Sequence, residues 1–203
     1  MSEKDMWAIE NGLFARGINT ICGVDEAGRG PLAGPVCAAA VILPRGIEIP
    51  GLDDSKKLSD KRRRELFPII QEQAVAYGIG FASHEEIDSI NILQATFLAM
   101  ERAIAQLSVK PEFALIDGNR EKDFGLPVKT VVKGDSLSAS IAAASVLAKV
   151  SRDVLMEKYA EEYPQYGFEI HKGYGTKAHY EALRQFGPSP IHRMSFLKKF
   201  YAK

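Results

Sequence analysis

Cysteines, membrane-length apolar runs and a recognisable leader are what this sequence has little or none of. Only two cysteines occur, Cys22 and Cys37, and each lies in an apolar run. Such cysteines favour buried free thiols in a reducing compartment over a disulfide. No apolar stretch is long enough to span a bilayer, and residues 1–9 carry early acids without the long apolar region of a secretory signal. We therefore expect a cytoplasmic protein with no membrane partner.

A net charge is also absent, because 26 Lys and Arg residues balance 26 Asp and Glu residues. This balance argues against a histone-like or polybasic binder. Hydrophobic residues make up 46% of the chain and charged residues 26%, which is ordinary for a globular protein. A chain of 203 residues without repeats or low-complexity linkers fits one domain over residues 1–203. The lack of a spare apolar stripe favours a monomer.

Basic residues are nevertheless concentrated near the end of the chain. Residues 166–203 contain seven Lys or Arg against two acids, together with three of the four histidines. A second basic run occupies residues 61–64. Basic clusters are compatible with nucleic-acid binding, although for residues 61–64 a solvated helix face is the favoured interpretation. We expect residues from about 164 to 203 to form a basic helical segment that packs on the rest of the domain.

Hydrophobic periodicity and turn residues predict an α/β fold with a mixed central sheet flanked by helices. A Gly- and Pro-rich turn between the first two predicted strands favours an antiparallel pair. Ser59, Asn91 and Thr176 are the expected N-caps of three helices, and Asp135 is expected to cap a fourth that is rich in small residues and stops at Pro164. The predicted strands cover residues 20–25, 36–43, 74–82, 113–116 and 128–132. The predicted helices cover residues 5–15, 59–73, 91–107, about 136–163 and, as the last one, 176–186.

The most informative segment is residues 21–31, in which a short apolar strand ends at two adjacent carboxylates, Asp25 and Glu26. A Gly28-Arg29-Gly30 turn follows at once. Carboxylates at the end of a strand are well placed to bind a divalent cation. The glycines let the backbone come close to a ligand, and an arginine beside them can bind an anion. The segment therefore indicates phosphate chemistry.

Two further acids lie at predicted element ends, Asp117 after a strand and Asp135 before a helix. Each alone is more typical of a turn or a helix cap, but with Asp25 and Glu26 they favour a site. Four converging carboxylates repel one another unless cations lie between them. Two Mg²⁺ ions about 3.5–4 Å apart are the known chemical use of such a cluster. Because successive side chains on a strand point to opposite faces, we expect Asp25 to bridge the ions and Glu26 to be more peripheral.

The motifs of this chain resemble those of ribonuclease HII, the type 2 ribonuclease H family. Residues 23–36 look like the opening signature of that family. The likeness covers nearly the whole chain in the same order, and its remaining motifs are residues 54–59, 116–118, 133–135, 141–145, 148–150, 152–153, 171–176, 187–193 and 195–196. The resemblance implies an RNase H-like fold with a C-terminal helical segment.

The resemblance also implies an activity and a set of catalytic acids. The implied enzyme hydrolyses the RNA strand of RNA–DNA hybrids and nicks on the 5′ side of ribonucleotides embedded in duplex DNA, leaving 5′-phosphate and 3′-hydroxyl ends. Its role would be to remove misincorporated ribonucleotides and RNA primers. The implied cofactor is Mg²⁺ or Mn²⁺, two ions in the catalytic state. By the family pattern, the residues that are both catalytic and metal-binding are Asp25, Glu26, Asp117 and Asp135.

Residues for the substrate follow from the same resemblance. The turn of residues 28–30 is implied to read the ribose 2′-hydroxyl, largely through its backbone. Tyr174 is implied to stack on the sugar of the following deoxynucleotide, although without the family it is equally an ordinary loop aromatic. Lys56 or Lys57 would stabilise developing charge. The candidate phosphate contacts, each of which is otherwise an exposed charge, are Lys133, Lys149, Arg152, Lys172, His192 and Arg193. His171 and His179 are expected to be surface or structural residues.

Three other functions compete with this interpretation. Ribonuclease HIII resembles the same pattern but carries an extra N-terminal domain and a Glu as its fourth acid, whereas only a short leader precedes the first strand here and the fourth position is Asp135. A non-catalytic RNA- or hybrid-binding module has no use for converging acids. A small-molecule phosphatase fits the acids but not the basic end of the chain.

Overall fold

The computed structural model describes residues 5–202, which form helices around one five-stranded sheet. The strand order is β3-β2-β1-β4-β5. Strands β1 to β3 pair antiparallel, whereas β4 is parallel to β1 and β5 is parallel to β4. The strands are β1 (Ile21–Ala27), β2 (Val36–Ile42), β3 (Ala76–Ala82), β4 (Phe113–Asp117) and β5 (Val128–Val131). The predicted α/β class, mixed sheet and antiparallel first pair are confirmed.

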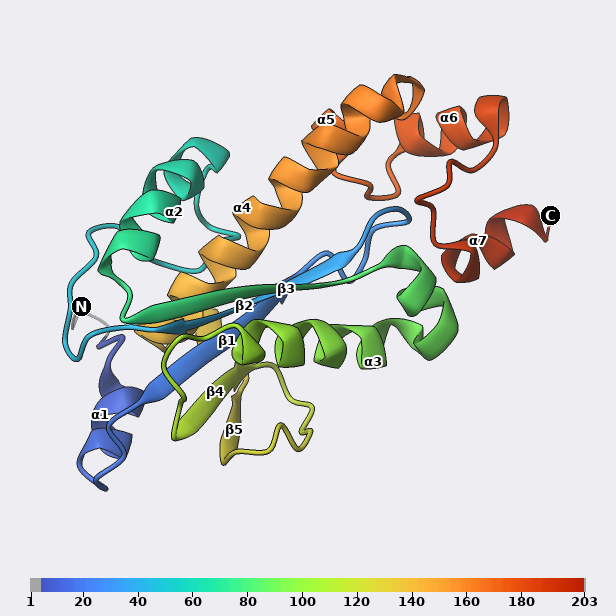
Figure 1. Cartoon of the computed structure of the whole chain (residues 1–203). Helices are drawn as coiled ribbons and strands as arrows, with labels where there is room; N and C mark the ends of the chain where they lie inside the picture. Colours follow the sequence, from blue (N-terminus) through green and yellow to red (C-terminus); the bar gives the residue numbers. More distant parts are fainter. Residues whose placement is uncertain (1–4, 203) are drawn as a thin grey trace.

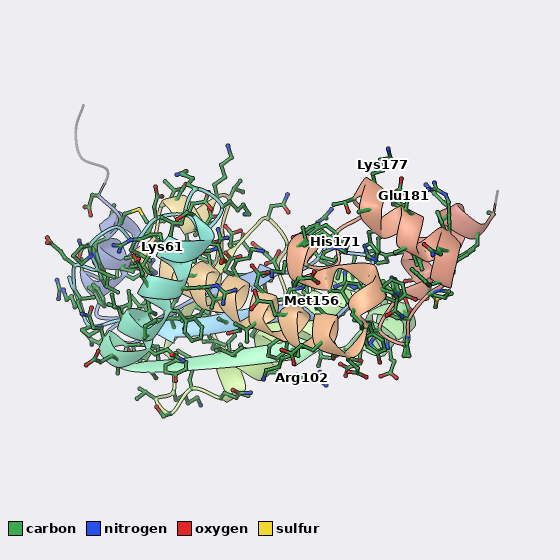
Figure 2. The ribbon with its side chains drawn as sticks, turned by 90° about the horizontal axis from the view of Figure 1, so that it is seen from above. Lys61, Arg102, Met156, His171, Lys177 and Glu181 are labelled. Atoms are coloured by element: carbon green, nitrogen blue, oxygen red, sulfur yellow. The ribbon has the colours of Figure 1, made fainter. Side chains whose placement is uncertain are left out.

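Helices cover both faces of the sheet (Figure 1). Helix α3 packs on one face against β3 and β2, and α4 packs on the other against β1 and β2 with α2 beside it. The view from above shows α2, which carries Lys61, at one end of the molecule and α6, which carries Lys177 and Glu181, at the other (Figure 2). The helices are α1 (Ala8–Phe14), α2 (Asp60–Gln73), α3 (His84–Ala105), α4 (Ala139–Glu162), α5 (Phe168–His171), α6 (Lys177–Phe186) and α7 (Met194–Tyr201).

Alternation along the strands divides the core into two layers. Cys22 and Val24 of β1 pack with α3, whereas Cys37 and Val41 of β2 pack with α2 and α4. Both thiols are free and fully buried, as the sequence predicts, and burial raises the pKa of Cys22 to about 12. None of the helices within residues 5–202 is long and apolar enough to cross a membrane.

Helix α4 lies against the backbone of β1, and Gly23 is the residue that permits this contact. A Cβ atom at Gly23 would lie 2.1 Å from the carbonyl carbon of Ser140 and 2.3 Å from the nitrogen of Ile141. The small residues of α4 keep the helix narrow on its buried side. The start of α4 is therefore held directly over the central strand.

The start of α4 corrects one sequence prediction. Asp135 does not cap this helix, because it lies in a separate 3₁₀ turn, η1 (Gly134–Ser136). The cap is Ser138, whose side chain accepts a hydrogen bond from the backbone of Ile141. Asp135 is thereby released from capping, and its carboxylate is free for other contacts.

Two further helix boundaries differ from the prediction. Helix α3 begins at His84 with a capping box formed by Ser83 and Glu86, and it is kinked at Asn91, which has φ 67° and ψ 164°. The Asn91 side chain accepts hydrogen bonds from Leu93 and Gln94, so it does cap the second part of the helix as predicted. Helix α6 is not the last helix, because α7 follows it.

The segment after residue 164 packs on the far half of α4. Met156 of α4 shares a buried cluster with Phe168 of α5, Leu183 of α6 and Leu197 of α7. Helix α7 is tied to α3 by Asp88, which accepts hydrogen bonds from the first backbone N–H groups of α7. These contacts hold the C-terminal helices beside the turn that follows β1.

Replacing Gly23 with alanine should lower the free energy of unfolding by about 1–3 kcal/mol or more, because the new methyl group meets helix backbone that cannot move aside. The matched control is Gly12→Ala in α1, where a Cβ has nothing within 4 Å. This control should be neutral or stabilise by up to about 1 kcal/mol. Urea denaturation of both variants checks the contrast, and equal effects would contradict the proposed close contact.

Candidate active site

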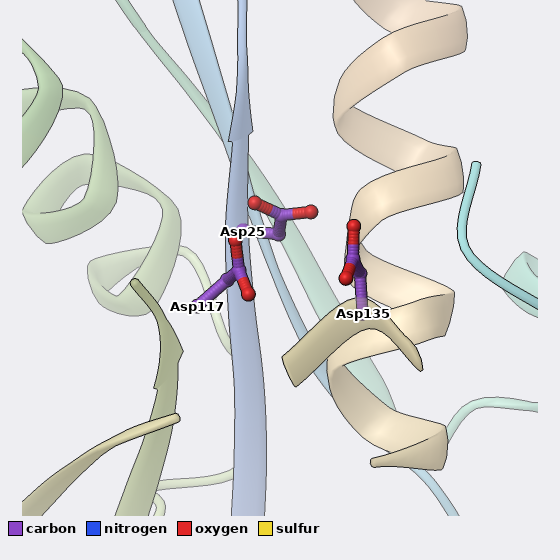
Figure 3. A group of neighbouring side chains, drawn as sticks. All are labelled: Asp25, Asp117 and Asp135. Atoms are coloured by element: carbon purple, nitrogen blue, oxygen red, sulfur yellow. The ribbon is translucent and has the colours of Figure 1, made fainter. Parts of the chain in front are cut away.

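Three acids from separate parts of the chain converge on one point beside β1 (Figure 3). Asp25, Asp117 and Asp135 each offer a carboxylate oxygen, and these atoms lie within 4.8 Å of one another. The parallel pairing of β1 with β4 sets Val24 opposite Ile116, so the next residues, Asp25 and Asp117, lie side by side. Asp135 comes from η1, just before α4. The convergence that the sequence predicts is therefore present.

Glu26 lies outside this group of three. Strand β1 does not end at Asp25 as predicted but continues to Ala27, because its pairing with β2 extends to Cys37. Regular alternation then turns Glu26 to the opposite face. There an Arg29 guanidinium nitrogen lies 3.3 Å from its carboxylate. The peripheral position expected for Glu26 agrees with this strand geometry.

Each carboxylate of the cluster is oriented by one hydrogen bond. Asp25 Oδ1 accepts from the backbone N–H of Glu26 at 2.6 Å, and Asp117 Oδ1 accepts from that of Gly134 at 2.6 Å. Asp135 Oδ2 accepts from Lys56 Nζ at 3.2 Å. Since each of these bonds involves one oxygen, further lone pairs of the three carboxylates are available to a ligand.

Burial and mutual repulsion disfavour the charged forms of these acids. The pKa of Asp25 is raised well above its ordinary value by burial and by the neighbouring Glu26 and Asp117. Burial and Asp117 likewise raise the pKa of Asp135, although Lys56 opposes this. Carboxylate oxygens are the ligands that hard divalent cations prefer. The donor set thus fits Mg²⁺ or Mn²⁺, which would compensate the uncancelled negative charge.

The acids line a cleft of about 210 Å³ that continues to the glycine turn. Tyr174, with 43% of its surface exposed, also lines the cleft. Ser55 lines it too and is a site residue that the sequence analysis did not single out, although it lies directly before Lys56. The lining comprises Asp25, Glu26, Ala27, Gly28, Arg29, Gly30, Ser55, Lys56, Asp117, Lys149 and Tyr174.

Arg193 lies beneath the turn and not in the cleft. It is fully buried, and its guanidinium donates hydrogen bonds to the carbonyl oxygens of Gly28, Arg29 and Gly34. Burial and the nearby Arg152 lower its pKa to about 9. This arrangement does not support the predicted phosphate contact, because the side chain has no exposed surface. Arg193 instead shapes the turn.

Arg152 and two lysines are likewise placed away from the cleft wall. Arg152, also buried, donates to the carbonyl oxygens of Ala33, Pro35 and Lys172. Lys57 forms an ion pair with Asp53 at 3.1 Å. Lys133 is exposed with a left-handed backbone, φ 57°. Of the predicted basic substrate contacts, Lys56 and Lys149 are the ones on the lining.

An α/β fold with a mixed sheet and a carboxylate cluster beside its central strand defines a candidate metal-binding hydrolase site. The sequence pattern described as Ribonuclease HII matches residues 22–199. The chain therefore belongs to the ribonuclease HII family, and the predicted resemblance is confirmed.

Individual relatives agree with this assignment. The chain is 54% identical over 196 residues to the ribonuclease HII of Geobacter metallireducens, covering 97% of this chain and 92% of the relative. It superposes on the crystal structure of the ribonuclease H2 from Pyrococcus horikoshii OT3 with a TM-score of 0.73 and 27% identity, covering 91% of this chain and 99% of that one. Bst-RNase HIII, at 22% identity and a TM-score of 0.65 over 86% of this chain and 66% of that one, shares the fold alone.

Family membership supports a type 2 ribonuclease H activity, which makes the chain a nuclease that acts on RNA–DNA hybrids. The fold is RNase H-like, as the resemblance implies. The alternative of a ribonuclease HIII is not favoured, because the HII pattern spans most of the chain at high identity to HII relatives.

Removing one charge from the cluster should stabilise the metal-free protein. The pKa of Asp25 is raised in the folded state, so its ionisation at neutral pH opposes folding. Asp25→Asn keeps an oxygen for the Glu26 N–H and should raise the free energy of unfolding in EDTA by on the order of 1 kcal/mol.

Divalent metal should then reverse the ranking. Mn²⁺ should raise the melting temperature of the wild type by linkage and that of Asp25→Asn far less. The control is Glu181→Gln on the exposed surface of α6, which should respond to Mn²⁺ as the wild type does. Differential scanning fluorimetry checks both steps. Equal Mn²⁺ responses in wild type and Asp25→Asn would rule out this cluster as the metal site.

Proposed function

We propose that this chain is an endoribonuclease that hydrolyses the RNA strand of RNA–DNA hybrids and nicks on the 5′ side of ribonucleotides embedded in duplex DNA. Its products carry 5′-phosphate and 3′-hydroxyl ends, and its task is to remove misincorporated ribonucleotides and RNA primers. One observation carries the proposal: a single cleft joins the carboxylate cluster to the glycine turn and to Tyr174. Chemistry on the phosphate and recognition of the sugar thus share one surface.

The acids of the cleft are the proposed metal ligands. Asp25, Asp117 and Asp135 would hold Mg²⁺ or Mn²⁺, with Glu26 at the edge of a two-ion site. When bound, such ions generate hydroxide at neutral pH and stabilise the charge that develops on the phosphate. The carboxylates themselves orient this centre through their hydrogen bonds to Glu26 N–H, Gly134 N–H and Lys56.

The glycine turn is the proposed reader of the 2′-hydroxyl. Arg193 draws the carbonyl oxygens of Gly28 and Arg29 inward. Because a trans peptide points its C=O and the following N–H in opposite directions, the N–H groups of Arg29 and Gly30 are directed away from Arg193. Within residues 5–202 neither N–H has a hydrogen-bond partner. Both residues line the cleft, so their donors are available to the group that distinguishes RNA from DNA.

Tyr174 is the proposed stacking surface for the sugar of the next deoxynucleotide. Its ring lies beside the glycine turn, since a Cβ at Gly30 would be 3.6 Å from Tyr174 Cε1. This position supports simultaneous contact of the turn and the ring with adjoining nucleotides. Preference for an RNA–DNA junction would follow.

Lysines are proposed to balance phosphate charge at this cleft. Lys56 reaches Asp135, and Lys149 lies on the lining while paired with Asp153 at 2.8 Å. A lysine ammonium beside the acids can stabilise the charge of the transition state. The exposed Lys57 and Lys133 would contact flanking phosphates, with a smaller effect on the rate.

Asp25→Asn should abolish cleavage and leave substrate binding largely intact, because it removes a metal ligand without changing the shape of the cleft. The assay uses duplex DNA that holds one ribonucleotide, with and without Mg²⁺, and gel electrophoresis detects the nick. Glu181→Gln serves as the control and should cut like the wild type.

Other outcomes of this assay separate the competing functions. Retention of the duplex without cutting by the wild type would favour a binding module. Neither binding nor cutting would leave the phosphatase. Near-normal turnover by Asp25→Asn would refute the assignment of the acids.

The two glycines of the turn should respond differently to alanine. At Gly28, which has φ +93°, a Cβ would lie 1.9 Å from Arg152 Nε, so Gly28→Ala should lose both stability and cleavage. At Gly30 the nearest atom to a Cβ is Tyr174 Cε1 at an ordinary 3.6 Å. Gly30→Ala should keep wild-type stability but cut more slowly, because the methyl group occupies the substrate side of the turn. Thermal melts and kcat/KM check this, and wild-type cleavage by Gly30→Ala would count against the proposed reading of the sugar.

A further inference from the structure

Tyr174 sits on a short loop of unusual backbone shape, residues 172–175 between α5 and α6. Lys172 has φ 50° and Gly173 has φ 84°. A Cβ at Gly173 would lie 2.7 Å from the carbonyl oxygen of Ala33, so the loop is pressed against the segment that follows the glycine turn. Left-handed conformations at two successive residues need support from outside the loop.

Two buried histidines supply part of this support. His179 on α6 and His192 before α7 are 0% and 2% exposed. The backbone N–H of Ser189 donates to His192 Nδ1 at 2.9 Å, so the ring proton of His192 is on Nε2. That Nε2–H donates to His179 Nε2 at 2.9 Å. The Nδ1–H of His179 then donates to the carbonyl oxygen of Tyr174, also at 2.9 Å.

A third histidine holds the other side of the loop. His171 accepts from the backbone N–H of Gly173 through Nδ1 at 3.2 Å, and its Nε2 donates to the carbonyl oxygen of Tyr166 at 2.7 Å. Its ring stacks on that of His179 with centroids 4.5 Å apart. The N–H of Gly173 and the C=O of Tyr174 are thus both fixed by imidazoles.

All three rings act as neutral groups in this arrangement. Each has one nitrogen that accepts and one that donates, which a doubly protonated imidazole cannot do. Burial lowers the pKa of His179 and of His192 to about 4, and adjacent imidazoles lower both further. The direction of the hydrogen-bond chain, from Ser189 to Tyr174, is therefore fixed at neutral pH.

The side chain of Tyr174 has no comparable restraint of its own. Among the described residues its hydroxyl forms no hydrogen bond, and 43% of the residue's surface is exposed. The position of the ring over the cleft therefore depends on its main chain. The main-chain carbonyl is the atom that His179 holds.

We propose that His179, oriented by His192, is a positioning residue that sets the place of Tyr174 in the cleft and thereby the efficiency of cutting at an embedded ribonucleotide. The inference rests on the proposed function, in which Tyr174 contacts the substrate. It adds that a buried polar chain behind the cleft, not in contact with nucleic acid, controls that contact.

A double-mutant cycle tests this role. His179→Leu removes the donor to Tyr174, whereas His179→Asn retains an N–H close to the position of Nδ1; both shorten the ring and lose the bond to His192. Each is made in the wild-type background and in Tyr174→Ala. The measurements are kcat/KM on duplex DNA with one ribonucleotide in Mg²⁺, and the melting temperature.

Coupling through Tyr174 gives a distinct pattern. His179→Leu should lower kcat/KM about 10- to 100-fold in the wild-type background, the size expected for a misplaced contact group, and less than about twofold in Tyr174→Ala. His179→Asn should recover most of the loss. The melting temperature should fall in both backgrounds alike, since packing is lost in each. If His179→Leu does not fold, His192→Met, which removes the donor to His179, should show the same coupling with smaller size.

Contrary outcomes point to different failures. Equal loss of kcat/KM in both backgrounds, or no recovery with His179→Asn, would overturn the positioning role and leave a structural one. Wild-type kcat/KM in Tyr174→Ala would overturn both the role of Tyr174 and this inference. A wild-type protein that does not nick the duplex would instead refute the proposed function.

Discussion

The contact between the backbone of α4 and that of β1 at Gly23 is the constraint on which the site depends. A helix that approaches a strand this closely has one position along it, because backbone atoms cannot yield as side chains can. The turn η1 is joined to the start of α4 and is tied to β4 by the bond from Gly134 N–H to Asp117. Docking of one helix therefore sets Asp135 opposite Asp25 and Asp117.

Two buried guanidiniums do for the substrate side of the cleft what this contact does for the acids. Arg152 and Arg193 form no ion pair among the described residues and donate to backbone carbonyl oxygens. Desolvation of an arginine is costly, and hydrogen bonds to several carbonyls offset it. Because these carbonyls belong to residues 28–35 and to Lys172, the turn and the Tyr174 loop share one rigid support.

Much of this arrangement follows from the sequence, and the exceptions have physical causes. Asp25 and Asp117 follow apolar runs, so their strands and their proximity are predictable, as is the outward turn of Glu26. Asp135 was misjudged because Ser138 is an equally good cap and only the docking of α4 decides between them.

Arg193 and the histidines were harder to place. They lie in the basic end of the chain, where composition predicts exposed charges. An arginine neutralised by carbonyl oxygens, or a histidine kept neutral by burial, has no local pattern in the sequence, because its partners lie more than ten residues away or come from other elements. Tertiary packing alone reveals them, and the same packing separates residues that line the cleft from residues that support it.

The alanine-rich start of α4 has an energetic consequence of its own. Ala142, Ala143 and Ala144 are completely buried, yet an alanine has no side-chain rotamers to lose when it becomes ordered. Alanine is also the residue most disposed to be helical. The element that must be immobilised most completely is thus the one whose immobilisation sacrifices least conformational entropy. The geometry of the acids is maintained with little thermodynamic opposition from the segment that enforces it.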